Sequence, residues 1–272
     1  MLISNFFYIL AAILPAIIIL LYVFKQDTFP EPKEIVIKTF IFGAGITIAL
    51  DLFIGDFDRF SEKNLSGETY FFFDSFIRAA FLEEIFKMMI IVFYCTRKSA
   101  FDEPMDGLIY GSAASLGYAA WENIDYVLYY INESGMMVYD PSLHVAIVRA
   151  FSAVPLHALC GVMMGFLISQ TLFEKRYNFY NLILALAVPV GIHGLWNYSL
   201  SSEVVSEQIA YITAFVIFIR AIVIFNNFKK AQLNKTMFNI RHYAISVRKF
   251  SKAAIIVLLF YSLLTFIVYT FS

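Results

Sequence analysis

An apolar run from Phe71 to Cys95 is long enough to cross a membrane, yet it carries Glu83, Glu84 and Lys87 at its centre. A helix rises about 1.5 Å per residue, so Glu83 would lie roughly 18 Å from either end of the run. An ionised residue at that depth costs about 2.5–3.5 kcal/mol, so such residues face a protein interior or a wet cavity. The chain must therefore fold so that other helices cover this face.

Composition places the whole chain among membrane proteins. Of the 272 residues, 60% are hydrophobic and 30 are Phe, which lies outside the range of soluble globular domains. The net charge of −1 gives no indication of nucleic-acid binding, and the sequence has neither a phosphate loop nor zinc-finger spacing. Cys95 and Cys160 do not form a CxxC pair, so we expect no disulfide and no thiolate metal site.

Long apolar spans separated by short polar breaks predict an all-α bundle of about eight transmembrane helices, folded as a single domain over residues 1–272. The expected spans are 3–24, 35–54, 71–95, 106–131, 144–173, 178–200, 204–225 and 253–271. The charged stretch from Gly55 to Gly67 is expected to be a loop.

The distribution of Lys and Arg predicts the orientation of these spans. The loops after the first, third, fifth and seventh spans hold fourteen basic residues: Lys25, Lys33, Lys38, Arg97, Lys98, Lys175, Arg176 and seven between Lys229 and Lys252. The opposite loops hold only Arg59 and Lys63, so both termini are expected outside the cytoplasm. Within spans, Arg149 is expected to snorkel to the outer interface, and Arg78 to pair with Asp74 away from Glu83.

The segment 228–252 mixes basic residues with apolar residues at spacings of three and four. The apolar residues are Leu233, Met237, Ile240, Ala244 and Val247. Two interpretations stay open: an amphipathic helix that lies on the anionic inner leaflet, and a solvated basic cytoplasmic loop.

Three later spans also carry unusual polar residues. Glu122 lies on a narrow helical stripe of small and hydroxyl-bearing side chains, namely Gly111, Ser115, Tyr118, Tyr126 and Tyr129. His157 shares its face with Gly161, where a neighbouring backbone can approach closely. His193 and Asn197 follow Pro189 at successive steps of four, so they point the same way. Either histidine alone is equally well explained as a buried residue bonded to a carbonyl.

These residues are expected to lie at a similar depth in the membrane. Counted from the outer ends of their spans, Glu83, Glu122, His157 and His193 all lie between about 10 and 20 Å down. Because neighbouring spans run in opposite directions, chance would scatter them across the bilayer. We therefore expect one buried site. Its predicted catalytic residues are Glu83, Glu84, Glu122, His157, His193 and Asn197, with Lys87 and Tyr126 in support.

Three carboxylates and two imidazoles supply a general base for water, an acid for a leaving amine and donors for an oxyanion. Crowded carboxylates cannot all ionise, so one is expected to hold a proton and act as the acid. No Ser or Cys is placed as a nucleophile, which favours hydrolysis by activated water. A zinc ion held by Glu83, Glu122, His157 and His193 would also suit these residues, although HExxH spacing is absent. The structural alternative is an ion pair between Glu83 and Lys87, which leaves a second carboxylate unbalanced.

Taken in order, these stretches resemble the PrsW family of intramembrane proteases, relatives of the CAAX-processing and bacteriocin-processing membrane endopeptidases. EEIFK at 83–87 matches the EExxK motif, and WENIDY at 121–126 resembles FExxxY with Trp in place of Phe. The stretches around His157 and His193 resemble the two later histidine motifs. The resemblance covers about 71–200, the expected catalytic core. Asn197 stands where the PrsW pattern has Asp.

The resemblance implies an intramembrane endopeptidase, most naturally of the bacterial plasma membrane, that cuts membrane-embedded or membrane-proximal segments of proteins such as anti-sigma factors. Expected partners are thus a membrane protein substrate and the lipid bilayer. The resemblance also implies that Glu83, assisted by Glu84 and Glu122, activates water, while His193 and Asn197 hold the oxyanion. It leaves a zinc cofactor open, because Asn is a good oxyanion donor and a poorer metal ligand than Asp.

Two other classes of function stay open on the sequence. In a proton-coupled transporter the same Glu and His residues would form a relay, and Pro155 and Pro189 interrupt adjacent spans as in transporters. Against it, the sequence shows no inverted repeat. In a non-catalytic lipid-binding protein, the basic segment 228–252 would carry the function.

Overall fold

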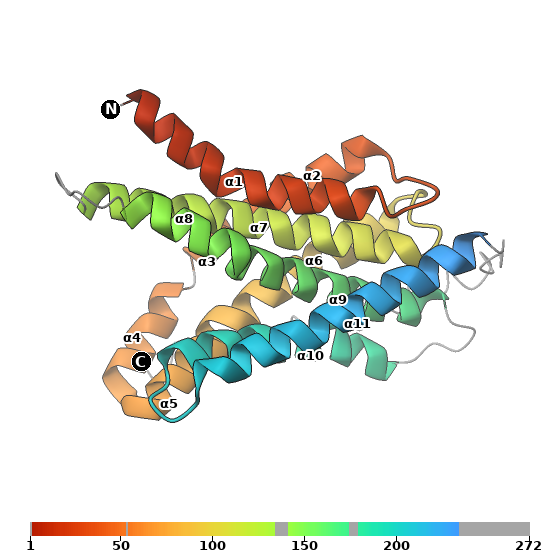
Figure 1. Ribbon diagram of the computed structural model, residues 1–272. Coiled ribbons are helices and arrows are strands. Elements are labelled where there is room, and N and C mark those ends of the chain that lie inside the picture. Colours follow the sequence, from red (N-terminus) through yellow and green to blue (C-terminus); the bar gives the residue numbers. More distant parts are fainter. Residues whose placement is uncertain (1, 53, 134–140, 174–178, 234–272) are drawn as a thin grey trace.

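The computed structural model describes residues 2–52, 54–133, 141–173 and 179–233. The described part is helical and contains no strand. Its elements are α1 (Leu2–Phe24), α2 (Lys33–Ala44), α3 (Ile46–Leu50), α4 (Ile54–Asn64), α5 (Gly67–Phe72), η1 (Phe73–Phe81), α6 (Leu82–Phe93), η2 (Cys95–Arg97), α7 (Pro104–Glu133), α8 (Pro141–Phe151), α9 (Ala153–Phe173), α10 (Phe179–Ser201) and α11 (Glu207–Leu233). They form a bundle of long helices (Figure 1).

Four helical stretches in the described part are long and apolar enough to cross a membrane: Phe6–Phe24, Ser142–Phe173, Tyr180–Ser201 and Glu207–Gln232. A fifth is added if α2–α3 and α4, which meet at a bend of 48°, form one span. The chain is therefore a multi-pass, all-α membrane protein. The expected number of about eight spans stays a prediction, and the span 253–271 and most of the segment 228–252 lie outside the described residues.

Helix α7 is the centre of the bundle and contacts α1, α2, α8 and α9. Against α9 it presents glycines at one-turn spacing. A Cβ atom at Gly111 would collide with the carbonyl oxygen of Gly161, and one at Gly165 with the carbonyl oxygen of Gly107. Small residues of this kind let the backbones of packed membrane helices touch. The close approach expected at Gly161 is confirmed.

One of the expected loops is a helix instead. The stretch Gly55–Gly67 was expected to be a loop, but most of it forms helix α4, because its charged residues share the helix with an apolar face that buries Phe57. The ring of Phe57 lies 6.2 Å from that of Phe73 of η1. The span expected at 144–173 is found as the helical stretch Ser142–Phe173. Within it, Ser152 separates α8 from α9, three residues before Pro155, whose missing N–H interrupts helical hydrogen bonding.

The segment η1, which leads directly into Glu83, is a π-helix of nine residues. At about 100° per residue Asp74 would lie opposite Glu83. A π-helix turns through a smaller angle per residue, so Asp74 and Arg78 instead line the same cavity as Glu83. The expectation that this pair faces away is therefore wrong. Arg78 Nε lies 3.4 Å from Asp74 Oδ1 and 2.7 Å from Asp58 Oδ1 of α4.

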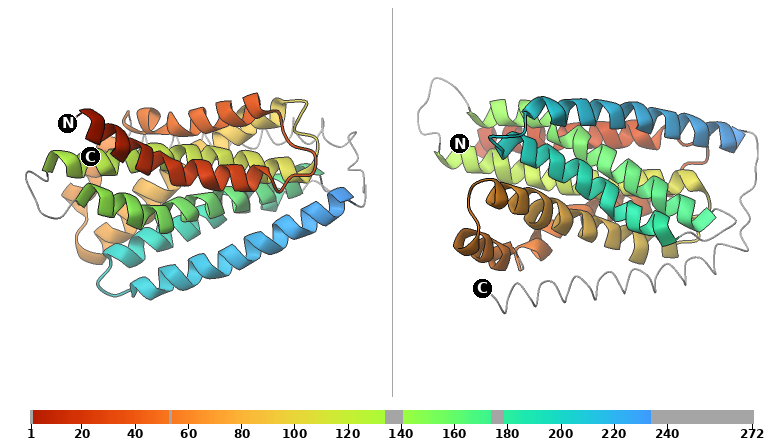
Figure 2. Two further views of the ribbon diagram at one scale, coloured as in Figure 1. Left: turned by 45° about the horizontal axis from the view of Figure 1, so that its top comes forward. Right: turned by 90° about the horizontal axis from the view of Figure 1, so that it is seen from below.

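The elements that carry the predicted site surround one region. Helix α10 contacts η1, α6 and α9, and α6 contacts α7. Figure 2 shows η1 and α6 running alongside α10 below the central helices. Residues of η1, α6, α7, α9 and α10 thus converge.

Candidate active site

A cavity of about 270 Å³ lies between these helices. Six of the eight residues predicted for the site line it: Glu83, Glu122, Tyr126, His157, His193 and Asn197. The other two, Glu84 and Lys87, have fully buried side chains next to Glu83 and His193. Residues from four helices that are far apart in the sequence are thus brought together around one cavity.

Lys87 lies at the centre of the cluster. Its ammonium donates to Glu84 Oε1 at 2.8 Å and to Glu83 Oε2 at 3.4 Å. It also lies 3.2 Å from Nδ1 of His157, and 4.2 Å from the centre of the Tyr118 ring. The ammonium has three N–H groups, and each has an acceptor. Lys87 therefore fixes two carboxylates and one imidazole relative to one another.

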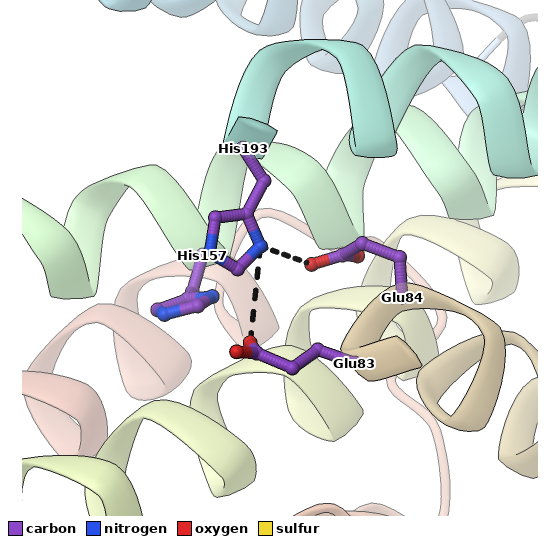
Figure 3. Close-up of side chains that lie close together, drawn as sticks. All are labelled: Glu83, Glu84, His157 and His193. Carbon is purple, nitrogen blue, oxygen red and sulfur yellow. Dashed lines mark hydrogen bonds and ion pairs between the residues drawn. The ribbon is translucent and has the colours of Figure 1, made fainter. Parts of the chain in front are cut away.

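Each histidine also has a carboxylate partner. His157 Nε2 lies 3.1 Å from Glu122 Oε2. His193 Nδ1 lies 3.1 Å from Glu84 Oε1 and 3.8 Å from Glu83 Oε2 (Figure 3). The two imidazole rings are 4.9 Å apart and nearly perpendicular. A carboxylate partner fixes the orientation and the tautomer of an imidazole, as at metal sites and catalytic sites.

Arg149 also belongs to this site, although the sequence did not indicate this. Its Nη2 lies 2.5 Å from Glu122 Oε2, and its Nε donates to Asn123 Oδ1 at 2.6 Å. The guanidinium also lies 4.0 Å from the centre of the Tyr126 ring. Only 14% of the Arg149 side chain is exposed, so the expected snorkelling is wrong. Helix α7 has no Lys or Arg, so Glu122 needs a basic partner from another helix, and this was the one sequence signal for Arg149.

The cluster suits a metal ion. Glu83, Glu84, His157 and His193 are buried, and each offers one ligand atom, all within 4.8 Å of one another. Oxygen Oε2 of Glu84 is buried without a hydrogen-bond partner among the described residues. Two carboxylates and two imidazoles are donors that zinc prefers. The group contains Glu84 where the predicted ligand set has Glu122.

The net charge of the cluster also suits a bound cation. Glu83, Glu84 and Glu122 supply three negative charges when ionised, and Lys87 and Arg149 supply two positive charges. With neutral imidazoles one negative charge is left in a buried site. A bound cation or a proton would balance it.

Comparison with known proteins relates the chain to one family of proteases. The family model described as PrsW family intramembrane metalloprotease matches residues 31–224, which include every predicted site residue. Protease PrsW of Oceanobacillus iheyensis is 33% identical over 70% of this chain and 81% of its own length. Protease PrsW of Bacillus subtilis is 32% identical over 77% of this chain and 88% of its own length.

Protease PrsW of Clostridioides difficile is 29% identical over 71% of this chain and 79% of its own length. No solved structure gives a significant match. The family match spans most of the chain and includes the buried Glu, His and Lys cluster. The chain therefore belongs to the PrsW family of intramembrane metalloproteases.

Proposed function

We propose that this membrane protease is an endopeptidase that hydrolyses peptide bonds in or beside the bilayer, with Glu83 as the base that activates water. One observation carries the assignment of the base. Of the two adjacent glutamates, Glu83 lines the cavity, whereas the side chain of Glu84 is fully buried and held by Lys87 and His193. A base must reach the water from which it takes the proton.

In the proposed reaction Glu83 takes a proton from water, and the water oxygen forms a bond to the scissile carbonyl carbon. The carbonyl electron pair moves to oxygen, where the side-chain amide of Asn197, beside His193 on the same face of α10, would donate a hydrogen bond. Glu83 then returns its proton to the amide nitrogen, the C–N bond breaks, and a carboxylic acid and an amine leave. Glu84, Lys87, Glu122 and Arg149 hold these groups in place.

Metal binding by the same residues is part of the proposal. Glu84, His157 and His193 would hold a zinc ion, which leaves Glu83 available as the base. Three protein ligands and an open position are typical of catalytic zinc. When bound, the ion would polarise the carbonyl and make water more acidic.

The substrate class and the location are also proposed. The substrates would be membrane proteins such as anti-sigma factors, cut in or near their membrane segments, as the family resemblance implies. The protein would lie in a bacterial plasma membrane as a single domain with both termini outside, which is supported by its basic loops and its bacterial relatives. Neither the comparisons nor the described residues support the transporter alternative.

The test is cleavage of a panel of single-pass membrane proteins by the purified protein in liposomes. Glu83→Gln should abolish cleavage, whereas Glu34→Gln, which changes an exposed carboxylate of α2, should not alter it. Loss of cleavage after chelation, with recovery on adding Zn²⁺, would support the metal. Cleavage by Glu83→Gln at the wild-type rate would refute the assignment of the base.

A further inference from the structure

A second group of carboxyl groups lies at the opposite end of the bundle from α4 and α5. There the α1–α2 connection, the start of α7 and the end of α11 meet, at the right of Figure 1. The group consists of Asp27, Glu31, Glu103 and Asp106. The side chains of Asp27, Glu31 and Asp106 are 7%, 5% and 0% exposed. The predicted orientation places this end on the cytoplasmic side.

Some of these oxygens have clear structural roles. Asp106 Oδ2 accepts hydrogen bonds from the backbone N–H groups of Asp102 and Glu103, both at 2.7 Å, and so caps the start of α7. Gln232 of α11 donates to Asp27 Oδ1 at 2.7 Å and also to Glu103. Capping and the contact with Gln232 therefore account for the burial of one carboxylate oxygen of Asp106 and one of Asp27.

The other oxygens are not explained in this way. Asp106 Oδ1 and Asp27 Oδ2 are buried and have no hydrogen-bond partner in the part of the chain that the structure describes. Within the same part, no Lys or Arg forms an ion pair with any of the four carboxylates. Asp27, Glu103 and Asp106 each offer one oxygen, and these oxygens lie within 4.8 Å of one another. Buried charge of one sign at this density requires a counter-charge.

The pKa shifts of the group agree with the lack of a basic partner among the described residues. Burial raises the pKa of Asp27 and of Glu31, and it raises the pKa of Glu103 to about 7 despite the hydrogen bond from Gln232. Ionised carboxylates are therefore costly here unless a cation lies among them.

We propose that Asp27, Glu103 and Asp106, with Glu31 beside them, bind a hard divalent cation, Ca²⁺ or Mg²⁺. The donors are all oxygen atoms, which suits these ions and disfavours the softer metals that take imidazole or thiolate ligands. The bound ion would join the α1–α2 connection to the start of α7, and Gln232 extends the link to the end of α11. This site is separate from the catalytic cluster and does not depend on the proposed hydrolysis.

A shared proton is the main rival explanation. Glu31 lies beside Asp106, and Tyr110 donates to Glu31, so a protonated carboxyl pair would also relieve the repulsion. A proton and a cation make opposite predictions for pH. A proton stabilises the group at acidic pH, whereas Ca²⁺ binds better as the carboxyl groups ionise.

The experiment is equilibrium dialysis of the full chain in detergent against ⁴⁵Ca²⁺, with unlabelled Mg²⁺ as competitor, together with thermal unfolding with and without Ca²⁺. Asp106→Asn keeps an oxygen for capping and removes the charge. Asp102→Asn is the matched control, since it removes an exposed carboxylate from the same segment. The same measurements on Glu83→Gln separate this site from the catalytic cluster.

Wild type, Asp102→Asn and Glu83→Gln should bind Ca²⁺ alike, and Ca²⁺ should raise their unfolding midpoint by about 3 °C or more. Asp106→Asn and Asp27→Asn should each bind at least about tenfold more weakly. Equal binding by wild type and both aspartate variants would overturn the proposal. So would a midpoint that responds to acidification and to no divalent ion, which is the shared-proton result.

Discussion

The guanidinium of Arg149 and the carboxylate of Glu122 lie 2.5 Å apart, and they come from different helices, α8 and α7. The same oxygen of Glu122 lies 3.1 Å from Nε2 of His157. Arg149 therefore controls the charge and the position of the carboxylate that orients one of the two buried imidazoles. This contact supplies the second positive charge that the three glutamates require.

Replacing Arg149 with Met should lower the cleavage rate about ten- to a hundredfold, since outer residues that orient a site commonly have effects of this size. It should also lower stability, because Glu122 loses its counter-charge. The double variant Arg149→Met/Glu122→Gln should recover stability but not activity. Rate and thermal midpoint are the measurements, and an unchanged rate in Arg149→Met would contradict this role.

Lys87→Met should destabilise the protein by about 3–5 kcal/mol, because it leaves buried carboxylates without their cation. It should also abolish cleavage, since Glu83, Glu84 and His157 lose their common donor. Lys98→Met is the control, because Lys98 also lies over an aromatic ring, that of Tyr94, but outside the cluster. Similar losses in unfolding free energy for both variants would show that Lys87 has no special role.

Asn197→Ala should reduce kcat by about 10²–10³ with little change in KM, which is typical of losing one oxyanion donor. Asn197→Asp removes the donor and adds a carboxylate, so it should lower kcat while binding Zn²⁺ at least as tightly as wild type. Asn181→Ala, near the other end of α10, is the control. If Asn197→Asp cleaves at the wild-type rate, the residue is not an oxyanion donor.

Gly161→Ala should destabilise the protein and impair cleavage, because the added Cβ would meet the carbonyl carbon and oxygen of Gly111 and push α7 away from α9. Gly191→Ala in α10 is the matched control, since a Cβ there meets nothing within 4 Å. That change should be neutral or stabilising, by up to about 1 kcal/mol. Thermal unfolding of the two variants in detergent distinguishes these outcomes.

Glu68 in α5 should make stability depend on acidic pH. Hydrogen bonds from Tyr198 and Ser202 lower the pKa of Glu68, so the ionised form is favoured in the folded protein. The stability that Glu68 contributes is complete above the ordinary carboxyl pKa of about 4.3. It is lost as the pH falls through the lowered pKa of Glu68 in the folded protein. The difference in midpoint between wild type and Glu68→Gln should therefore be constant near neutral pH and shrink in acid. A difference that grows in acid would contradict this.

Much of the helical pattern could be predicted from the sequence, and so could most of the acidic and histidine residues that line the cavity. Long apolar spans can be recognised from the sequence alone. Polar residues inside such spans stand out because charge there is costly, as with Glu83, Glu122, His157 and His193. Helical periodicity also placed His193 and Asn197 on one face, and both line the cavity.

Other features depend on partners that only the folded chain brings together. The position of Arg78 could not be predicted, because nothing in the sequence marks the π-helix that rotates it toward the cavity. The role of Arg149 depends on a contact between α8 and α7. The cluster of acidic residues around Asp106 combines the α1–α2 connection with the start of α7, and each of these looks like an ordinary polar stretch in the sequence.

The two sides of the cavity are held together by different kinds of contact, and the glycines of α7 and α9 form one of them. Glu122 and His157 are carried by two helices whose backbones touch at Gly111 and Gly161, so main-chain atoms limit how closely these helices approach. On the other side, Glu83 and His193 are carried by the α6 and α10 side, where the side chain of Phe76 in η1 packs against Gly194. Side-chain packing yields more readily than backbone contact. A peptide that enters the cavity would therefore meet a wall set by backbone contact at α7 and α9, and one set by side-chain packing at η1 and α10.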